Sequence, residues 1–388
     1  QETTPYWNAL KEAYEAANPN VTIEMVDLGS TDYMTVLATE LSGSGSDFDV
    51  VTIKDVPGYA TLVQKNTLES LDDYIADAGI NLADFNGITD QVTVDGSLYE
   101  LPFRSDYWLI YYNKDVFDAA GIAYPSNDMT IEDYDALARQ LTDTTYGSQV
   151  YGCHYHTWRS AVELFGILDG KHSILDGNYD WMIPYYDMIL SEEDDGVCQT
   201  YTDLSTEGLH YSAAFSNGNV AMMNMGSWFI STLISNLDSG EYDSSLCGNW
   251  GIASYPHPDG AEAGSTIATI TGLAVTSASA NKDAAFDFVN WVSGTEGAKV
   301  MASTGNFPAI MTDDVINTIA GMAGFPTDES SKEALNITNA YLEVPYAENV
   351  SEINSILDTY HTSIMNREVT VEEGVASMNE QVGKILNQ

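Results

Sequence analysis

Apolar positions near the start of the chain switch between helical and strand spacing. Alternation of this kind is typical of an α/β fold with a parallel sheet and crossover helices. The pattern predicts, in order, a helix at 6–17 that ends at Asn18-Pro19, a strand at 21–26, a helix at 33–41 that ends in a Gly/Ser stretch at 42–46, and a buried strand at 49–53.

The rest of the chain continues this mixture without internal repeats or a long linker. Strands are expected in both halves, so we expect the chain to cross between two lobes more than once. From about residue 310 the pattern is almost entirely helical and ends in an apolar stripe over 371–385. The other predicted elements are a hairpin at 92–101 turning at Asp95-Gly96, a strand at 108–112, helices at 114–120 and from Thr130 to Leu141, helices near 158–168, 182–190 and 205–215, a strand at 220–224, a helix at 227–236, strands at 250–253 and 271–276, and a helix around Phe286.

The charge of the chain limits its partners. It has 58 Asp and Glu against 13 Lys and Arg, which is a formal net charge of −45. A surface this acidic repels a phosphate backbone, so we expect no nucleic-acid partner. The only arginines are residues 104, 139, 159 and 367, which are too few for a strongly basic pocket, and neutral ligands remain. The same self-repulsion favours a monomer.

The cysteines and histidines give little support for a metal site. Cys153, Cys198 and Cys247 lack the paired spacing of a zinc ribbon, and they allow at most one disulfide, whose pair the sequence does not select. His154 and His156 beside Cys153 could start a metal site, but no second cluster of ligands follows. We therefore predict neither a metal nor a cofactor. No apolar run in the sequence is long enough to span a membrane.

Large aromatic residues stand next to Asp, Asn, His or Arg where the predicted strands end. Ligands of open α/β sheets bind at the carboxyl ends of the strands. Flat rings cover the apolar faces of a sugar, and planar polar groups bind its hydroxyls, so this grouping suits a neutral polyhydroxylated ligand. The alternative, that each ring belongs to the core, stays open. The residues with this grouping also include Asp32, Tyr107, Trp108, His154 and Tyr155. The candidates that we select are Tyr33, Lys54, Asp55, Tyr59, Arg104, Asp106, His156, Trp158, Arg159, Asn224 and Trp228.

An enzyme has weaker support. Glycoside hydrolysis needs two carboxylates at a defined separation. Pairs such as Asp55 and Asp106 always exist among 58 acidic residues, so they carry little information. The sequence contains no G-x-S-x-G, P-loop or H-E-x-x-H motif, and the Gly43-x-Gly45 pair does not continue into a dinucleotide fingerprint.

Several segments resemble the family 1 extracellular solute-binding proteins of ABC importers, specifically the carbohydrate-binding branch of Gram-positive bacteria. They follow one another along the chain in the same order as in that family. The segments that carry the resemblance are YEAANPNVTI at 14–23, DFDVVTI at 47–53, GSLYELPF at 96–103, YYNKDVFDAAG at 111–121, MTIEDY at 129–134, NVAMMNMGSW at 219–228 and AAFDFVNW at 284–291. The segment at 111–121, which begins YYNKDVF, and the segment that ends in Trp228 are the most specific.

The resemblance implies a non-enzymatic protein with a two-lobed, periplasmic-binding-protein-like α/β fold, whose lobes are linked by several chain crossings. It would capture a neutral oligosaccharide between the lobes and deliver it to ABC permease subunits. It also implies an extracellular location, with a lipid anchor on the outer face of the cytoplasmic membrane. We expect lobe I to comprise 1–109 and 268–310, and lobe II to comprise 110–267 and 311–388.

Two features depart from the family pattern: the usual strand before the first helix and the lipidated cysteine are both missing. A chain that opens at Gln1 with helical patterning suggests a processed or trimmed start, which fits both departures. A glycoside-acting enzyme on a related fold and a binding protein for another solute, such as a cation, stay open. The identity, linkage and length of the sugar are not predicted.

By position, the resemblance assigns roles to individual residues. Trp228 resembles the tryptophan that stacks on the sugar, and Arg104 with Asp106 lies where hydroxyl-binding groups usually do. Tyr59, Trp158 and Arg159 are the next choices. Asn306-Phe307 precedes an expected chain crossing and is a further candidate, whereas Lys54 and Asp55 could instead pair with each other at the rim of the site.

Closure of the two lobes should depend on the ligand, because a site that encloses a sugar must open to admit it. We expect the hinges near 106–112, 264–272 and 308–312. Small-angle scattering should show a smaller radius of gyration when the protein is saturated with a confirmed sugar. An unchanged radius of gyration at saturation would show that closure is wrong for this protein.

Overall fold

The computed structural model describes residues 4–29, 32–43, 47–85, 87–145, 147 and 149–387. They form two compact α/β units, and the chain passes repeatedly from one unit to the other. This confirms the predicted α/β class with several crossings. Part of the Gly/Ser stretch expected to end the second helix, residues 44–46, lies outside the described residues. Unit 1 comprises 1–106, 269–322 and 344–351, and unit 2 comprises 107–268, 323–343 and 352–388. Residues 311–322 and 344–351, which the sequence placed in lobe II, thus group with unit 1.

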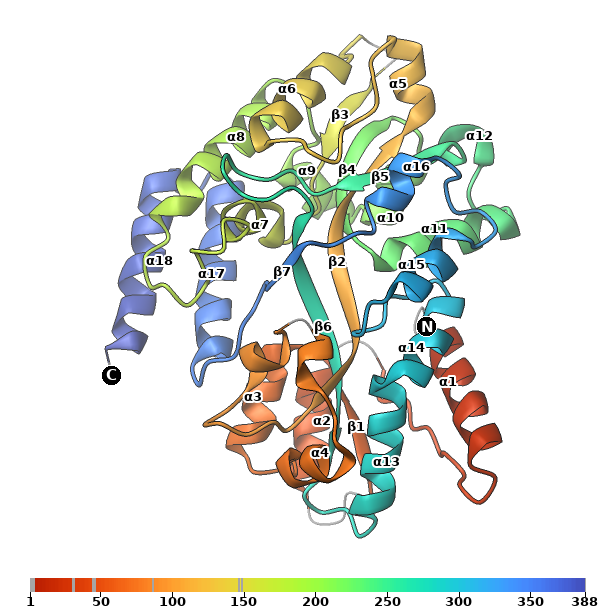
Figure 1. Cartoon of the computed structure of the whole chain (residues 1–388). Helices are drawn as coiled ribbons and strands as arrows, with labels where there is room; N and C mark the ends of the chain where they lie inside the picture. Colours follow the sequence, from red (N-terminus) through yellow and green to blue (C-terminus); the bar gives the residue numbers. More distant parts are fainter. Residues whose placement is uncertain are drawn as a thin grey trace. The chain divides into compact units, whose positions relative to one another are not determined.

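Unit 1 contains more helix than strand. The apolar stripe of α1 buries Tyr6, Leu10 and Tyr14, and α1 packs against α13 and α14 (Figure 1). The Tyr14 ring meets the edges of Phe288 and Trp291 at centroid distances of 4.9 and 5.4 Å. The helices of unit 1 are α1 (Thr4–Ala17), α2 (Tyr33–Ser42), α3 (Val56–Gln64), α4 (Asp72–Ala78), the 3₁₀ helices η1 (Leu82–Phe85) and η2 (Thr89–Val92), α13 (Lys282–Ser293), α14 (Thr295–Ser303) and α15 (Asp313–Ala320).

The strand predicted at 21–26 is wrong. The structure describes these residues as irregular chain, with Met25 and Val26 exposed at 45% and 57%. The segment is tied to α1 because the Ile23 backbone N–H donates to Glu15 Oε1 at 2.7 Å. β-Branched composition indicated a strand, but a strand also needs a neighbour for its backbone groups.

The prediction of a parallel sheet is also wrong, because most pairings in the sheet are antiparallel. In unit 1, β1 (Val50–Ile53) pairs antiparallel with the second half of β6 (Ser265–Val275), from Val50 opposite Val275 to Ile53 opposite Gly272. Strands that pair with distant segments of the chain do not need the crossover helix of a parallel unit. Local alternation of strand and helix therefore did not identify the true neighbours.

The predicted hairpin at 92–101 is present but narrower than expected. Val94 and Ser97 exchange two backbone hydrogen bonds of 2.9 Å. Asp95 and Gly96 form the turn with φ values of 50° and 85°, the two positive values that a type I′ turn requires. The chain then enters β2 (Leu101–Asn113), whose last residues belong to unit 2.

The sheet of unit 2 is mixed, and β2 lies between two antiparallel partners. β2 pairs with β4 (Val220–Gly226) and β5 (Trp250–Ser254). β3 (Tyr151–His154) runs parallel to β4, and the first half of β6 runs parallel to β7 (Asn339–Leu342). Every residue of β4 is buried, so this strand lies inside the unit.

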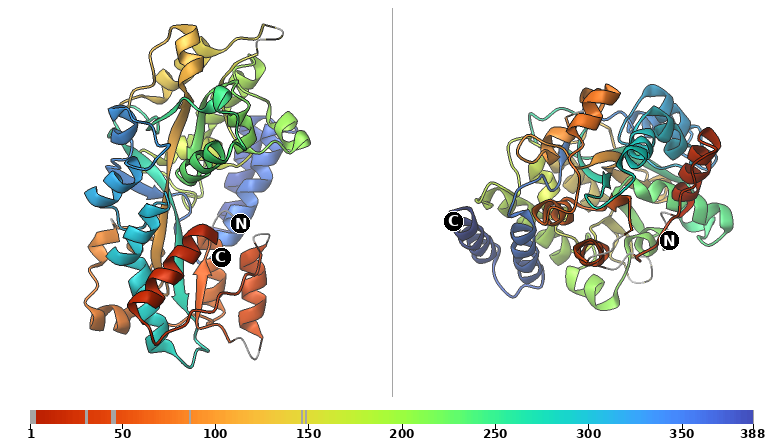
Figure 2. Two further views of the ribbon diagram at one scale, coloured as in Figure 1. Left: turned by 90° about the vertical axis from the view of Figure 1, so that its right-hand side faces the viewer. Right: turned by 90° about the horizontal axis from the view of Figure 1, so that it is seen from below.

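The helices of unit 2 largely follow the predictions. Thr130 and Asp133 form a capping box at the start of α6, and Gly121 ends α5 with φ 67°. The terminal helices α17 and α18 lie side by side (Figures 1 and 2). The helices are α5 (Lys114–Ala120), α6 (Ile131–Leu141), α7 (Ser160–Ile167), η3 (Asp180–Met182), α8 (Ile183–Asp194), α9 (Tyr201–Glu207), α10 (Tyr211–Ser216), α11 (Trp228–Ser239), α12 (Ser244–Cys247), α16 (Glu329–Glu333), α17 (Val350–Met365) and α18 (Val371–Leu386).

Two predicted helical regions need correction. The helix expected at 205–215 is divided, because Gly208 ends α9 in the left-handed conformation with φ 62° and His210 caps α10. The region after 310 is interrupted by β7 and by irregular segments, so it is not almost entirely helical. Among the helices that the structure describes, none combines the length and the apolar character needed to cross a membrane.

Candidate ligand-binding site

Three tryptophans from separate segments meet in unit 2 and form what we call the tryptophan cluster: Trp108, Trp158 and Trp228. The ring centroids of Trp108 and Trp228 lie 5.5 Å apart, those of Trp158 and Trp228 6.2 Å, and those of Trp108 and Trp158 6.3 Å. The rings meet at interplanar angles of 60° to 90°. Edge-to-face contact of this kind leaves ring faces free of one another.

The three rings differ in exposure. Trp108 is 3% exposed, Trp158 is 40% exposed, and Trp228 is half-buried. Trp108 is therefore the buried base of the cluster, and the other two rings have surface that a ligand can cover. An exposed large aromatic side chain that is held by other rings, rather than free to rotate, is suited to stacking on a flat apolar face.

The local backbone explains the position of Trp228. Gly226 at the end of β4 lies opposite Trp108 of β2, and a Cβ on Gly226 would lie 2.1 Å from the Trp228 ring. Glycine is therefore required for this ring to lie against the strand. Tyr111 Oη donates to the Gly226 carbonyl at 2.9 Å, and the Ser227 N–H donates to the Tyr107 carbonyl at 2.8 Å. These bonds fix the start of α11, where Trp228 is the first residue.

Polar groups accompany the rings. The His156 ring lies 4.6 Å from Trp158 and 5.4 Å from Tyr211 between centroids. Burial, with a smaller contribution from His210, lowers the pKa of His156 to about 4, so its imidazole is neutral at pH 7. Within the described part of the chain, His156 Nδ1 and Trp108 Nε1 are buried without a hydrogen-bond partner. Buried polar atoms normally have one, so these two uncharged polar atoms distinguish the cluster from an ordinary packed core.

Two other predicted residues of unit 2 lie in its interior with partners of their own. Asn224 accepts a hydrogen bond from Tyr134 Oη at 2.5 Å and donates one to Tyr255 Oη at 3.1 Å. The Arg159 guanidinium is buried in an ion pair with Glu163, with 2.6 Å between Nε and Oε2. The structure thus brings Trp158, Trp228 and His156 together, and gives Asn224 and Arg159 contacts that hold the fold. Their roles in binding stay predictions.

The predicted residues of unit 1 form two groups. Arg104 and Asp106 pair through two contacts, Nε to Oδ2 at 2.8 Å and Nη2 to Oδ1 at 3.3 Å. Arg104 also lies over the Tyr6 ring at 5.4 Å. The Ser105 N–H donates to the Phe307 carbonyl at 3.2 Å, which places Asn306 and Phe307 beside this pair. Asn306 and Phe307 are both buried, and Asn306 Nδ2 donates to Thr304.

The second group lies where β1 ends. Lys54 and Asp55 are exposed, and Asp55 Oδ1 caps α3 by accepting from the Gly58 N–H at 2.7 Å. Tyr33 is half-buried, and its hydroxyl donates to the Thr52 carbonyl at 3.1 Å. Tyr59 is fully buried, and its hydroxyl accepts from the Tyr99 N–H at 3.2 Å. Asp55 and Tyr59 therefore have structural partners, and binding by this group stays a prediction.

Sequence reasoning did not select Tyr211, and it noted Trp108 after the hairpin but left it out of the final candidates, although both contact the predicted residues. Trp108 belongs to a continuous buried strand, where an aromatic residue looks like any other core residue. Tyr211 starts α10 inside the region that was predicted as one helix. The signal that could have found the start of α10 at Tyr211 is Gly208, because a glycine in the left-handed conformation commonly ends a helix.

Comparison with known proteins places the chain among binding proteins. The family model described as "Bacterial extracellular solute-binding protein" matches residues 1–299. A sugar transporter of Rhizobium etli, solved in an open conformation, is 47% identical with a TM-score of 0.90, over 97% of this chain and 95% of that one.

Curated relatives are more distant. A mannitol-binding protein of Pseudomonas aeruginosa is 24% identical over 301 residues, 76% of this chain and 67% of that protein. A protein of Brucella abortus named as a binding protein is 27% identical over 239 residues, 57% of this chain and 54% of its own length. The chain thus spans about half the length of the Brucella protein.

Proposed function

The chain belongs to the family of bacterial extracellular solute-binding proteins, and from this premise we propose that it captures a neutral oligosaccharide for an ABC importer. In this proposal the protein works outside the cytoplasmic membrane as a monomer, held there by an N-terminal lipid, and delivers its ligand to permease subunits. It performs no catalysis. The Rhizobium and Pseudomonas relatives, named for a sugar and for mannitol, support a neutral carbohydrate or polyol ligand.

The tryptophan cluster is the observation that supports a sugar most directly. Trp158 and Trp228 offer ring surface, and His156 and Trp108 add uncharged polar atoms beside it. A pyranose presents apolar C–H faces and polar hydroxyl edges, so rings and neutral polar groups in one place match it. A cation would instead need oxygen or nitrogen ligands at close range. An anion would need positive charge, and the His156 imidazole is neutral at pH 7.

A thermal-shift screen tests this proposal. Di- to hexasaccharides and mannitol should be compared with divalent cations and polyamines under the same conditions. A ligand at 100 times its Kd adds about 2.7 kcal/mol to the free energy of unfolding, which is a clear rise in Tm. We expect a neutral saccharide to give the largest rise. If only cations raise the Tm, the sugar proposal is wrong.

The competing function, a glycoside-acting enzyme, is separated by one further measurement. The best saccharide from the screen should be incubated with the protein and the mixture followed by chromatography. A binding protein returns the saccharide unchanged, whereas an enzyme produces shorter sugars at a rate proportional to protein concentration.

A further inference from the structure

Two thiols and a carboxyl group meet inside unit 2. One ligand atom each from Cys153, Glu192 and Cys198 lies within 4.8 Å of the other two, and all three residues are buried. Cys153 belongs to β3, Glu192 to α8, and Cys198 to the segment that follows α8. We call this group the Cys–Glu–Cys cluster.

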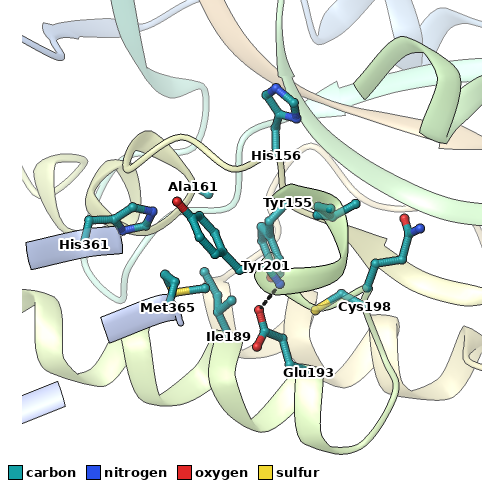
Figure 3. A pocket seen from close by; sticks show the side chains of 11 residues that line it. Tyr155, His156, Ala161, Ile189, Glu193, Cys198, Tyr201, His361 and Met365 are labelled. Carbon is teal, nitrogen blue, oxygen red and sulfur yellow. Dashed lines mark hydrogen bonds between the residues drawn. The ribbon is translucent and has the colours of Figure 1, made fainter. Parts of the chain in front are cut away.

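The fold explains why these residues meet although their spacing in sequence gave no sign of it. After α8 the chain turns at Gly196, with φ 71°, and the Val197 N–H donates back to the Glu192 carbonyl at 2.8 Å. The Val197 carbonyl then accepts from the Cys153 N–H at 3.4 Å, which holds the turn against β3. Figure 3 shows Cys198 on the wall of a small cavity that Tyr155 and His156 also line.

An independent observation at the cluster is the buried carboxyl group of Glu192. Glu192 is 0% exposed, and neither of its carboxyl oxygens has a hydrogen-bond partner among the described residues. Its neighbour Glu193 provides the contrast: Glu193 Oε1 accepts from the Tyr201 N–H at 2.8 Å (Figure 3), and Oε2 lies 3.3 Å from Arg367. A buried carboxyl group without partners is costly, and a bound cation would satisfy it.

We propose that the Cys–Glu–Cys cluster binds a thiophilic divalent cation, with Zn²⁺ as the natural occupant, through two thiolates and one carboxylate. Thiolate sulfur favours zinc over calcium or magnesium, which take oxygen ligands. Three protein ligands leave one tetrahedral position for water or for the Tyr155 hydroxyl, which is buried and has no hydrogen-bond partner in the described part of the chain. The ion would join β3 to the end of α8, which is a structural role independent of sugar binding.

Metal analysis of the purified protein tests the proposal. Wild-type protein, purified with a mild reductant and dialysed against zinc and then against metal-free buffer, should retain one equivalent of zinc by mass spectrometry. Titration with Co²⁺ should give the charge-transfer absorption of a thiolate-bound cobalt ion, which carboxylates on the acidic surface cannot produce. Added zinc should also raise the Tm.

Variants locate the site. Cys153→Ser and Cys198→Ser should each abolish the cobalt charge-transfer band, and Glu192→Gln should weaken binding at least tenfold. Cys247→Ser is the matched control, because Cys247 is also a buried free cysteine but lies in α12, outside the cluster; it should bind cobalt as the wild type does.

Three results would overturn the proposal. The first is wild-type protein without the charge-transfer band. The second is zinc retained equally by Cys153→Ser and Cys198→Ser, which would assign the metal to surface carboxylates. The third is a thiol titration under denaturing conditions showing that Cys153 and Cys198 form a disulfide that persists in the reductant. The band is measured on the wild type, so the test stands even if one variant fails to fold.

Discussion

Trp228→Ala should weaken saccharide binding roughly 5- to 140-fold while leaving the fold intact. A ring that stacks on a sugar contributes about 1–3 kcal/mol through buried area and ring-specific contact, and 1.4 kcal/mol corresponds to a tenfold change in Kd. The Trp228 ring is half-buried and rests on Trp108 and Trp158. Its loss should therefore lower the Tm of the unliganded protein by only a few degrees. Isothermal titration calorimetry and a melting curve on the same variant give both quantities.

Trp181→Ala is the matched control for this experiment. Trp181 is also half-buried and also packs against another ring, since it stacks on His172 at 5.2 Å, but it lies in η3 and outside the tryptophan cluster. It should leave the Kd unchanged. A core tryptophan would instead cost about 3–5 kcal/mol of stability without a change in affinity. If Trp228→Ala collapses the Tm and retains the wild-type Kd, Trp228 does not belong to the binding site.

The parts of the site that could be predicted are those set by local sequence. Trp228 follows a short buried strand and a Gly-Ser pair, so its place at the start of a helix was readable from neighbouring residues. His156 and Trp158 likewise follow β3 directly. Each of these predictions depends only on how far the residue lies from the end of one strand. The end of a strand can be recognised from a few neighbouring residues.

The parts that could not be predicted depend on contacts between distant segments. The partner of β1 is β6, more than 200 residues further along the chain, so alternation of local elements gave the wrong strand direction. Cys153 meets Cys198 only because the turn after α8 returns to β3. Arg159 was predicted as a ligand contact from its neighbours, whereas its main partners are Glu163 and residues of α17. A spacing pattern carries no information on such pairs.

Arg159→Leu should cause the largest loss of stability among these variants. Arg159 is buried, with Nε 2.6 Å from Glu163 Oε2 and Nη2 donating to Asn354 Oδ1 at 2.7 Å; it also pairs with Asp358. Glu163 is 0% exposed, so removing the guanidinium leaves a carboxylate that water cannot reach. Breaking one partner of a buried ion pair costs about 3–5 kcal/mol. Chemical denaturation should show this loss directly.

Arg139→Leu is the control for a structural arginine at the surface. Arg139 also forms two ion pairs, with Asp135 at 2.8 Å and Asp195 at 2.6 Å, but all three side chains are partly accessible to solvent. Exposed pairs contribute about 0–1 kcal/mol, so this variant should unfold at nearly the wild-type denaturant concentration. If Arg159→Leu is as stable as Arg139→Leu but loses saccharide affinity, Arg159 belongs to the binding site after all.

The loss caused by Arg159→Leu should also grow with pH. Burial raises the pKa of Glu163, and Arg159 opposes that rise. Without Arg159 the pKa of folded Glu163 moves further above its unfolded value of about 4.3. Below the unfolded pKa, the carboxyl group is protonated in both the folded and the unfolded state and does not change the stability. As the pH rises from the unfolded pKa through the folded pKa, the unfolded chain loses the proton more readily than the folded protein, so the fold is destabilised. The difference in unfolding free energy between wild type and Arg159→Leu should therefore be larger at pH 8 than at pH 5. A difference that is equal at the two pH values would mean that the buried Glu163 carboxylate is not the source of the loss.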